Sequence, residues 1–177
     1  MARVKQWNFQ QQLSYLLFDP ISRRCALIDP LESLEEQYLE VIERKGLVLA
    51  WRLATRNELF DPAAEGQSLT PPQACRWQQL ALGELEIRVI CDSNQSRVAY
   101  LCDGLLFSGE WWLAGGLRPS VASRPDSDVD KLPLLQLPEE TLLFPGRVAG
   151  RLSISSIAQE KFLLQDSNPV WVGGHHD

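Results

Sequence analysis

The chain has 177 residues, enough for one well-filled core and short for two, because domains typically hold roughly 100 to 200 residues. Apolar residues make up 45% of the sequence and charged residues 23%, so neither disorder nor a coiled-coil class is indicated. The formal net charge of −6 leaves no excess of Lys and Arg to neutralise phosphates, which argues against nucleic acid as a partner. We therefore expect a single domain over residues 1–177 that binds no nucleic acid.

Membrane spans and export signals are not indicated by the sequence. No apolar run approaches the roughly 18 to 20 residues of a membrane span, and the opening MARVKQWNFQQQ lacks the apolar core of a signal peptide. We therefore expect a cytoplasmic protein that does not bind membranes. The cysteines are scattered and form no C-x-x-C pair, so we expect buried free thiols at Cys25, Cys75, Cys91 and Cys102.

The first part of the chain predicts a hairpin, a helix and a further strand. The hairpin turns at Asp19-Pro20, between two apolar runs. Residues 33–46 predict a helix, in which Ser33 and Glu36 have the spacing of a capping box. A strand follows this helix, so it is expected to lie parallel to a neighbouring strand. The predicted strands of this part are 13–18, 25–29 and 47–53.

The rest of the chain predicts more strands and a closing helix. Residues 62–72 are rich in Pro, Gly, Ser and Gln, which indicates a surface loop with little room for a helix. The Asp103-Gly104 pair between two apolar runs predicts a second hairpin, and residues 111–131 predict a long irregular loop. The predicted strands include 85–90 and 140–146, and the closing helix 155–164 is expected to turn Ile157, Phe162 and Leu163 inward.

Four segments taken together resemble one family. Residues 13–30, LSYLLFDPISRRCALIDP, resemble the paired first strands of glyoxalase II and the persulfide dioxygenases, which belong to the metallo-β-lactamase fold superfamily. Three later segments resemble that family's later hairpin, penultimate strand and C-terminal helix, in the family's order; they are 97–110, 137–147 and 155–169. The resemblance implies an α/β (α+β) fold, an αββα metallo-β-lactamase-like sandwich of two mixed sheets with helices outside.

The metal-binding motif of that family is altered in this sequence. In the family a strand ends in T-H-x-H-x-D-H, whose imidazole and carboxylate groups hold one or two transition metals. The matching stretch here is TRNELFD, residues 55–61, and its four ligand positions hold Arg56, Glu58, Phe60 and Asp61. The family's later G-D and P-G-H motifs end here in Glu110 and Arg147, and the two histidines of the chain lie within its last three residues. We therefore expect no metal and no cofactor.

Three functions are compatible with these residues. The first is a metal-free, non-catalytic relative of glyoxalase II and persulfide dioxygenase that acts as a binding or regulatory protein, by forming a homo-oligomer or pairing with an active relative. The second is an atypical hydrolase of glutathione thioesters or related esters, with Glu58, Asp61 or Glu110 as general base. The third is a sensor of small anions, in which Arg56 and Arg147 bind the ligand beside Trp111.

Structural roles can explain the same side chains. A buried ion pair between Glu110 and Arg147 would fill the former metal cavity, and removal of one partner of such a pair typically costs roughly 3 to 5 kcal/mol. Thr55 and Glu58 have the T-x-x-E spacing of a capping box. Adjacent tryptophans at the start of a loop, such as Trp111 and its neighbour, commonly anchor the loop on the core. These roles favour a protein that is not an enzyme.

Overall fold

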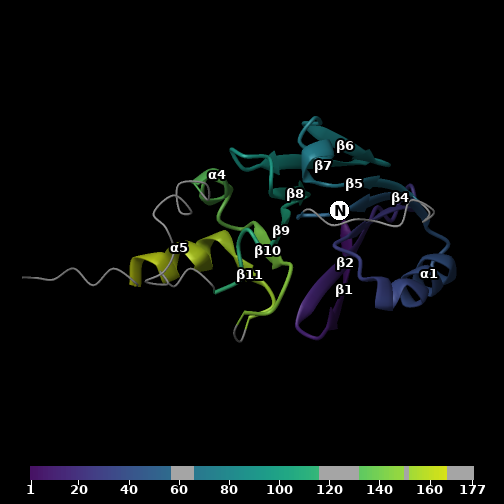
Figure 1. The fold of residues 1–177 in the computed structure, drawn as a ribbon, viewed down its shortest axis with the longest axis horizontal. Coiled ribbons are helices and arrows are strands. Elements are labelled where there is room, and N and C mark those ends of the chain that lie inside the picture. Colours follow the sequence, from purple (N-terminus) through teal and green to yellow (C-terminus); the bar gives the residue numbers. More distant parts are fainter. Residues whose placement is uncertain (57–65, 116–131, 150–151, 167–177) are drawn as a thin grey trace, which may run out of the picture.

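Two mixed β-sheets pack face to face in the computed structural model, which describes residues 1–56, 66–115, 132–149 and 152–166. Helices cover the outer face of each sheet, so the described residues form an αββα sandwich (Figure 1). In Figure 1, α1 lies beside the sheet of β1 and β2, and α5 lies beyond β10 and β11 on the opposite side. This architecture confirms the predicted fold class.

The first sheet has five strands in sequence order. Their pairing is antiparallel from β1 to β3 and parallel from β3 to β5. The hairpin and the parallel crossover strand predicted from the sequence are therefore confirmed. The strands are β1 (Arg3–Phe9), β2 (Gln12–Phe18), β3 (Arg24–Ile28), β4 (Val48–Leu53) and β5 (Gln67–Leu69).

The second sheet has six strands in the order β11-β10-β9-β8-β7-β6. All neighbours are antiparallel except β9 and β10. The hairpin of β8 and β9 turns at Asp103-Gly104, where both residues have a positive φ, as a type I′ turn requires. The strands are β6 (Gln79–Leu82), β7 (Leu85–Cys91), β8 (Val98–Cys102), β9 (Leu105–Gly109), β10 (Leu142–Pro145) and β11 (Ser155–Ser156).

The core of the sandwich is built from strand residues that alternate inward. Tyr15, Leu53, Tyr100 and Phe107 lie between the two sheets, where Tyr15 also packs against Phe144. A second cluster joins the outer face of the second sheet to α4 (Leu132–Leu135) and α5 (Ile157–Asp166). A third joins the outer face of the first sheet to α1 (Glu35–Arg44). The central strands of both sheets are thus buried on both faces.

The predicted first helix is present, but its capping box is not. Ser33 lies inside a short 3-10 helix, η1 (Glu32–Leu34), and α1 begins after it at Glu35. The residue at the N-cap of α1 is therefore Leu34, which offers no capping side chain. The predicted apolar face is confirmed, since Tyr38 and its neighbours on that face are buried against the first sheet.

Two further expectations are wrong. The segment 62–72 was expected to be a loop, but its described part contains β5 and the start of the one-turn helix α2 (Pro71–Ala74). The first turn of α2 is stabilised by the Thr70 N–H, which donates to Gln73 Oε1. Phe162 was expected to face inward, but its side chain is 61% exposed. On α5 the buried positions Ile157 and Glu160 are three residues apart and share a face, whereas Phe162 follows Glu160 by two residues and points away from that face.

No helix in the described ranges is long and apolar enough to cross a lipid bilayer.

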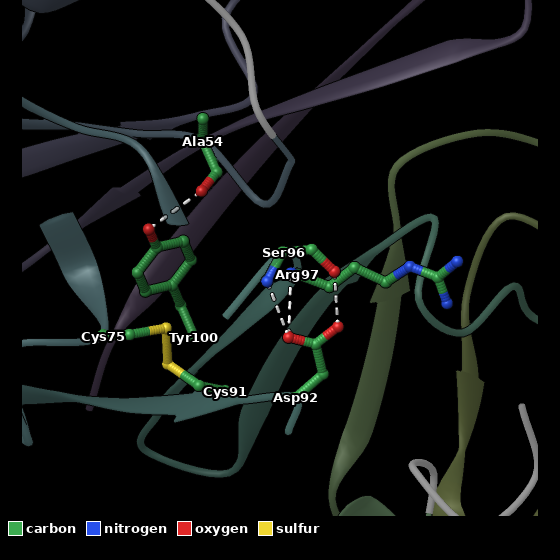
Figure 2. Close-up of a disulfide and its surroundings, with 7 residues drawn as sticks. All are labelled: Ala54, Cys75, Cys91, Asp92, Ser96, Arg97 and Tyr100. Carbon is green, nitrogen blue, oxygen red and sulfur yellow. Dashed lines mark hydrogen bonds between the residues drawn. A yellow bond between two sulfur atoms is a disulfide. The ribbon is translucent and has the colours of Figure 1, made fainter. Parts of the chain in front are cut away.

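The expectation of four free thiols is also wrong. Cys75, directly after α2, forms a disulfide with Cys91 at the end of β7, 16 residues further along the chain (Figure 2). Scattered cysteines gave no sign of this pair, because α2 and the end of β7 meet only in the folded chain. The expectation is correct for Cys25 and Cys102, which are free and buried.

Removal of this disulfide is predicted to lower the free energy of unfolding. Closing a loop of about 15 residues stabilises a fold by about 3 kcal/mol, so the double variant Cys75→Ser/Cys91→Ser should lose close to that amount in urea unfolding. A reductant should destabilise the wild-type protein and leave the double variant unchanged. Thiol titration of the unfolded, unreduced wild type should find two thiols, Cys25 and Cys102. Four titratable thiols would contradict the disulfide.

Candidate functional site

The ends of four strands meet at one edge of the sandwich. Asp29 follows β3 and Thr55 closely follows β4, and these two strands run parallel. Glu110 follows β9 and Arg147 closely follows β10, which are also parallel. The carboxyl ends of parallel strands share an edge, and that edge commonly holds the functional site of such a sheet. Asp29 also lies at the carboxyl end of a parallel strand, as residues 55–61 do, but it was not identified from the sequence.

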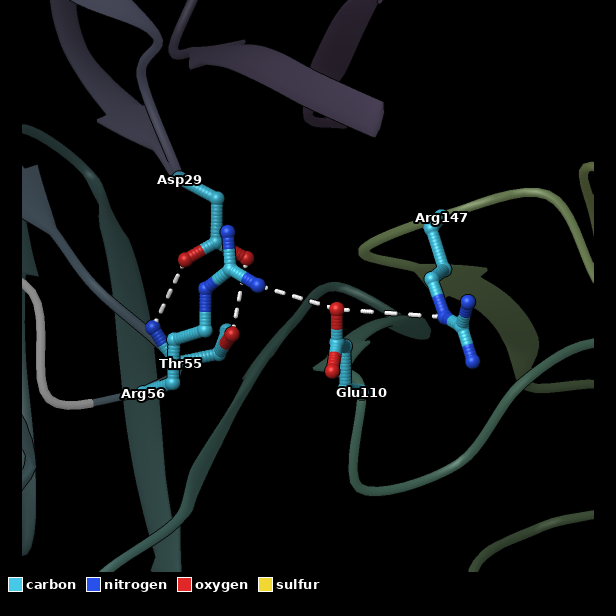
Figure 3. Close-up of polar contacts among 5 residues, drawn as sticks. All are labelled: Asp29, Thr55, Arg56, Glu110 and Arg147. Carbon is cyan, nitrogen blue, oxygen red and sulfur yellow. Dashed lines mark hydrogen bonds and ion pairs between the residues drawn. The ribbon is translucent and has the colours of Figure 1, made fainter. Parts of the chain in front are cut away.

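Asp29 fixes the backbone at the end of β4. Its carboxylate accepts hydrogen bonds from the Thr55 N–H at 2.8 Å and from the Thr55 hydroxyl at 2.7 Å, and both residues are buried (Figure 3). The Asp29 N–H in turn donates to the Leu53 carbonyl. Thr55 is therefore held by a carboxylate from the neighbouring strand, while its predicted capping partner, Glu58, lies outside the described residues.

Thr55 also brings the two sheets into close contact. A Cβ added at Gly109 would lie 1.9 Å from Thr55 Oγ1, and one added at Gly146 would lie 2.9 Å from the Gly109 Cα. Gly109 also has a φ of +57°, which disfavours other residues. The ends of β4, β9 and β10 can therefore approach this closely only because glycine stands at both positions.

Glu110 lies between two arginines at this edge. Arg56 Nη1 donates to Glu110 Oε1 at 2.9 Å, and Arg147 Nε lies 3.8 Å from the same oxygen (Figure 3). The structure thus brings together Arg56, Glu110 and Arg147, while Asp61 lies outside the described residues, as Glu58 does. The side chains of the three residues are 37%, 45% and 51% exposed, respectively, so the expectation of a buried pair of Glu110 and Arg147 is wrong. The pair is accessible because it lies beyond the strand ends rather than between the sheets.

Two buried tyrosines lie under this edge. The Tyr100 hydroxyl donates to the Ala54 carbonyl, and the Tyr15 hydroxyl donates to the Pro145 carbonyl. Burial, and to a smaller degree the charge of Asp29, raises the pKa of each phenol above its ordinary value. Both phenols are therefore neutral hydrogen-bond donors that support the strand ends, and neither can act as a phenolate base.

Two pockets open at the site, and they differ in size. The smaller lies among Leu13, Asp29, Thr55 and Gly146 and has a volume of about 10 Å³, which is about the space of one water molecule. The larger has a volume of about 230 Å³. It is lined by Thr55, Arg56, Ser96, Arg97, Glu110 and Trp111. Only the larger pocket has room for a ligand of several atoms.

Trp111 and Trp112 anchor the segment that follows β9. Both indoles are buried in the cluster under α5, which agrees with the expectation that adjacent tryptophans anchor a loop on the core. Trp112 Nε1 donates to the buried carboxylate of Glu160, which also accepts from the Gly115 N–H. Glu160 was not identified from the sequence, because a Glu in an amphipathic helix is ordinarily assigned to its exposed face. Trp111 additionally forms part of the wall of the larger pocket.

The comparisons with known proteins identify the architecture. No protein-family model matches the sequence, and no curated protein matches it. Among solved structures, ETHE1 from Myxococcus xanthus aligns over 92% of this chain and 83% of its own, with a TM-score of 0.71 and 20% identity. The BLEG-1 B3 metallo-β-lactamase aligns over 97% and 100%, with a TM-score of 0.66 and 18% identity. The chain has the metallo-β-lactamase fold.

A third structure with the metallo-β-lactamase fold is longer than this chain. The metallo-β-lactamase from Staphylococcus aureus subsp. aureus COL aligns over 94% of this chain with a TM-score of 0.72 and 18% identity. This chain covers 62% of that protein's length. At these identities the likeness establishes the fold alone.

The described residues do not fit the metal centre that the metallo-β-lactamase fold carries in the enzymes this sequence resembles. In those ranges no group of three or more His, Cys, Asp or Glu side chains lies close enough together to hold a metal ion. Zinc and iron sites of that kind depend on imidazole nitrogen, and the described motif positions at this edge hold Arg56, Glu110 and Arg147 instead. Two guanidinium groups beside the Glu110 carboxylate would also repel a cation.

The pairing of Arg56 with Glu110 is predicted to contribute little to stability. Because both side chains are more than one third exposed, a double-mutant cycle with Arg56→Met and Glu110→Gln should give a coupling free energy of about 0.2–1 kcal/mol in urea unfolding. The coupling should also decrease in high salt. A coupling of roughly 3 kcal/mol or more, the range of a buried pair, would contradict the exposed geometry.

Proposed function

We propose that this chain is a metal-independent, non-catalytic relative of glyoxalase II and the persulfide dioxygenases that acts as a binding protein. The observation that carries the proposal is the placement of Glu110 between Arg56 and Arg147. At the strand ends where the family's motifs place metal ligands, this chain has an internal ion-pair cluster. The proposal includes a partner, either a second copy of the chain or an active relative.

The geometry around Glu110 argues against the alternative of an atypical hydrolase. A general base must accept a proton from a water or a substrate, but Glu110 Oε1 already accepts a hydrogen bond from Arg56 and lies beside Arg147, which leaves Glu110 Oε2 for that role. Of the three carboxylates that this alternative assigns, Glu110 is the one in the described residues, and its contacts favour a structural role.

A turnover assay tests the proposal. The purified full chain, with and without added Zn²⁺, Fe²⁺ or Mn²⁺, should not hydrolyse glutathione thioesters or a chromogenic β-lactam, or oxidise glutathione persulfide, above the protein-free rate. Active enzymes of each type serve as positive controls for the assays. Metal-independent hydrolysis that Glu110→Gln abolishes and Arg88→Gln retains would establish the hydrolase alternative. Turnover that requires an added metal would refute the proposal in a different way, because it would show that the chain holds a metal after all.

A further inference from the structure

Arg97 presents a positive charge at the larger pocket without a carboxylate partner among the described residues. It lines that pocket, its side chain is exposed, and no ion pair or side-chain hydrogen bond connects it to another described residue. Figure 2 shows its guanidinium extending away from the nearby Asp92 carboxylate. With Arg56 and Glu110, the wall of the pocket therefore contains two guanidinium groups and one carboxylate, and Glu110 is also approached by Arg147.

The backbone that carries Arg97 is fixed by its surroundings. Asp92 accepts hydrogen bonds from the N–H groups of Ser96 and Arg97 and from the Ser96 hydroxyl (Figure 2). The Asp92 N–H donates to the Arg97 carbonyl, and the preceding residue, Cys91, is tied to Cys75 by the disulfide. The entropic cost of placing the Arg97 side chain against a ligand is thus limited to its own rotamers.

Trp111 forms part of the pocket wall, and its indole N–H is buried beneath it. Trp111 lines the pocket and is 3% exposed, and its buried indole Nε1 has no hydrogen-bond partner among the described residues. The neighbouring Trp112 has a partner in Glu160, so the unpaired donor is specific to Trp111. A buried donor without an acceptor is destabilising, so its surroundings are expected to be sensitive to a change in the pocket wall.

We propose that Arg97, together with Arg56, forms a binding site for a small oxyanion of the carboxylate or phosphate class in the pocket that Trp111 also lines. An excess of N–H donors and positive charge matches the acceptor-only oxygens of such an anion, and a guanidinium binds them in a two-pronged way. The volume of about 230 Å³ lies below the roughly 300–1,000 Å³ of typical ligand pockets, which indicates a ligand of few atoms. The inference rests on the proposed binding function and assigns a ligand class to the same site.

Titration of the full chain with inorganic phosphate, sulfate and acetate tests this site. Thermal melts at constant ionic strength, balanced with chloride, should show a saturable rise in melting temperature with at least one of the three anions. Arg97→Gln should weaken that anion roughly tenfold or more, the loss expected for a charge-assisted hydrogen bond. Arg97→Lys keeps the charge but loses the two-pronged guanidinium, so its affinity for the anion should lie between those of the wild type and Arg97→Gln. Arg88→Gln, an exposed arginine on β7 outside the pocket, should match the wild type.

An NMR measurement distinguishes binding in the pocket from general screening of surface charge, because it follows the chemical shift of one residue of the pocket wall. The indole N–H signal of Trp111, assigned by its loss in Trp111→Phe, should shift on saturation with the bound anion in the wild type and stay in place in Arg97→Gln. A melt that rises equally in Arg97→Gln, or no saturable rise with any of the three anions, would overturn the site. Either result would leave the turnover assay, and with it the metal-independent function, to be judged separately.

Discussion

The close approach of three strand ends is the constraint on which the candidate site depends. Glycines at positions 109 and 146 allow the backbones that follow β9 and β10 to touch each other and Thr55, and any side chain there would collide with its neighbours. Asp29, after β3, holds Thr55 in place. Because Thr55 of the first sheet contacts Gly109 of the second, both sheets contribute to the same junction. Arg56, Glu110 and Arg147 each follow directly from one of these contacts. Their meeting is therefore a consequence of backbone packing, and the ion pairs between exposed side chains are not what holds the edge together.

This junction can be kept while its chemistry changes. The backbone contacts require small residues and a buried hydroxyl–carboxylate pair, but they place few demands on the side chains that point out of the edge. In the sequences that this chain resembles, those positions carry metal ligands, whereas among the described residues they carry the guanidinium groups of Arg56 and Arg147 and the carboxylate of Glu110. Such a replacement makes the local charge more positive, so that the described part of the edge attracts anions rather than cations. A preserved fold with a different ligand class is thus physically consistent, because function depends on the site rather than on the fold.

Local patterns in the sequence were sufficient for β2, β3, β4, β7, β10 and the hairpin of β8 and β9, whereas β1, β5, β6 and β11 were not predicted. The Asp103-Gly104 turn and the alternation in β7 act over a few residues, and the resemblance in segment order gave the arrangement of the sheets. Several other features that the sequence did not reveal depend on contacts between distant segments. The Cys75–Cys91 bond requires α2 to reach the end of β7, and the burial of Glu160 depends on Trp112 and the Gly115 N–H being placed above α5. Arg97 was overlooked for the same reason, since only the folded chain brings its turn to the wall of the pocket.

The proposed function requires that side chains, rather than a metal, occupy the strand ends of this metallo-β-lactamase fold. The most direct measurement is the elemental content of the purified, untagged protein, combined with a thermal melt in the presence and absence of a strong chelator. A metal that binds only the folded state would raise the melting temperature, and the chelator would remove that gain. If side chains replace the metal, we expect a metal content near zero and the same melting temperature with and without the chelator. Stoichiometric zinc, iron or manganese, with a melting temperature that falls in the chelator, would contradict it.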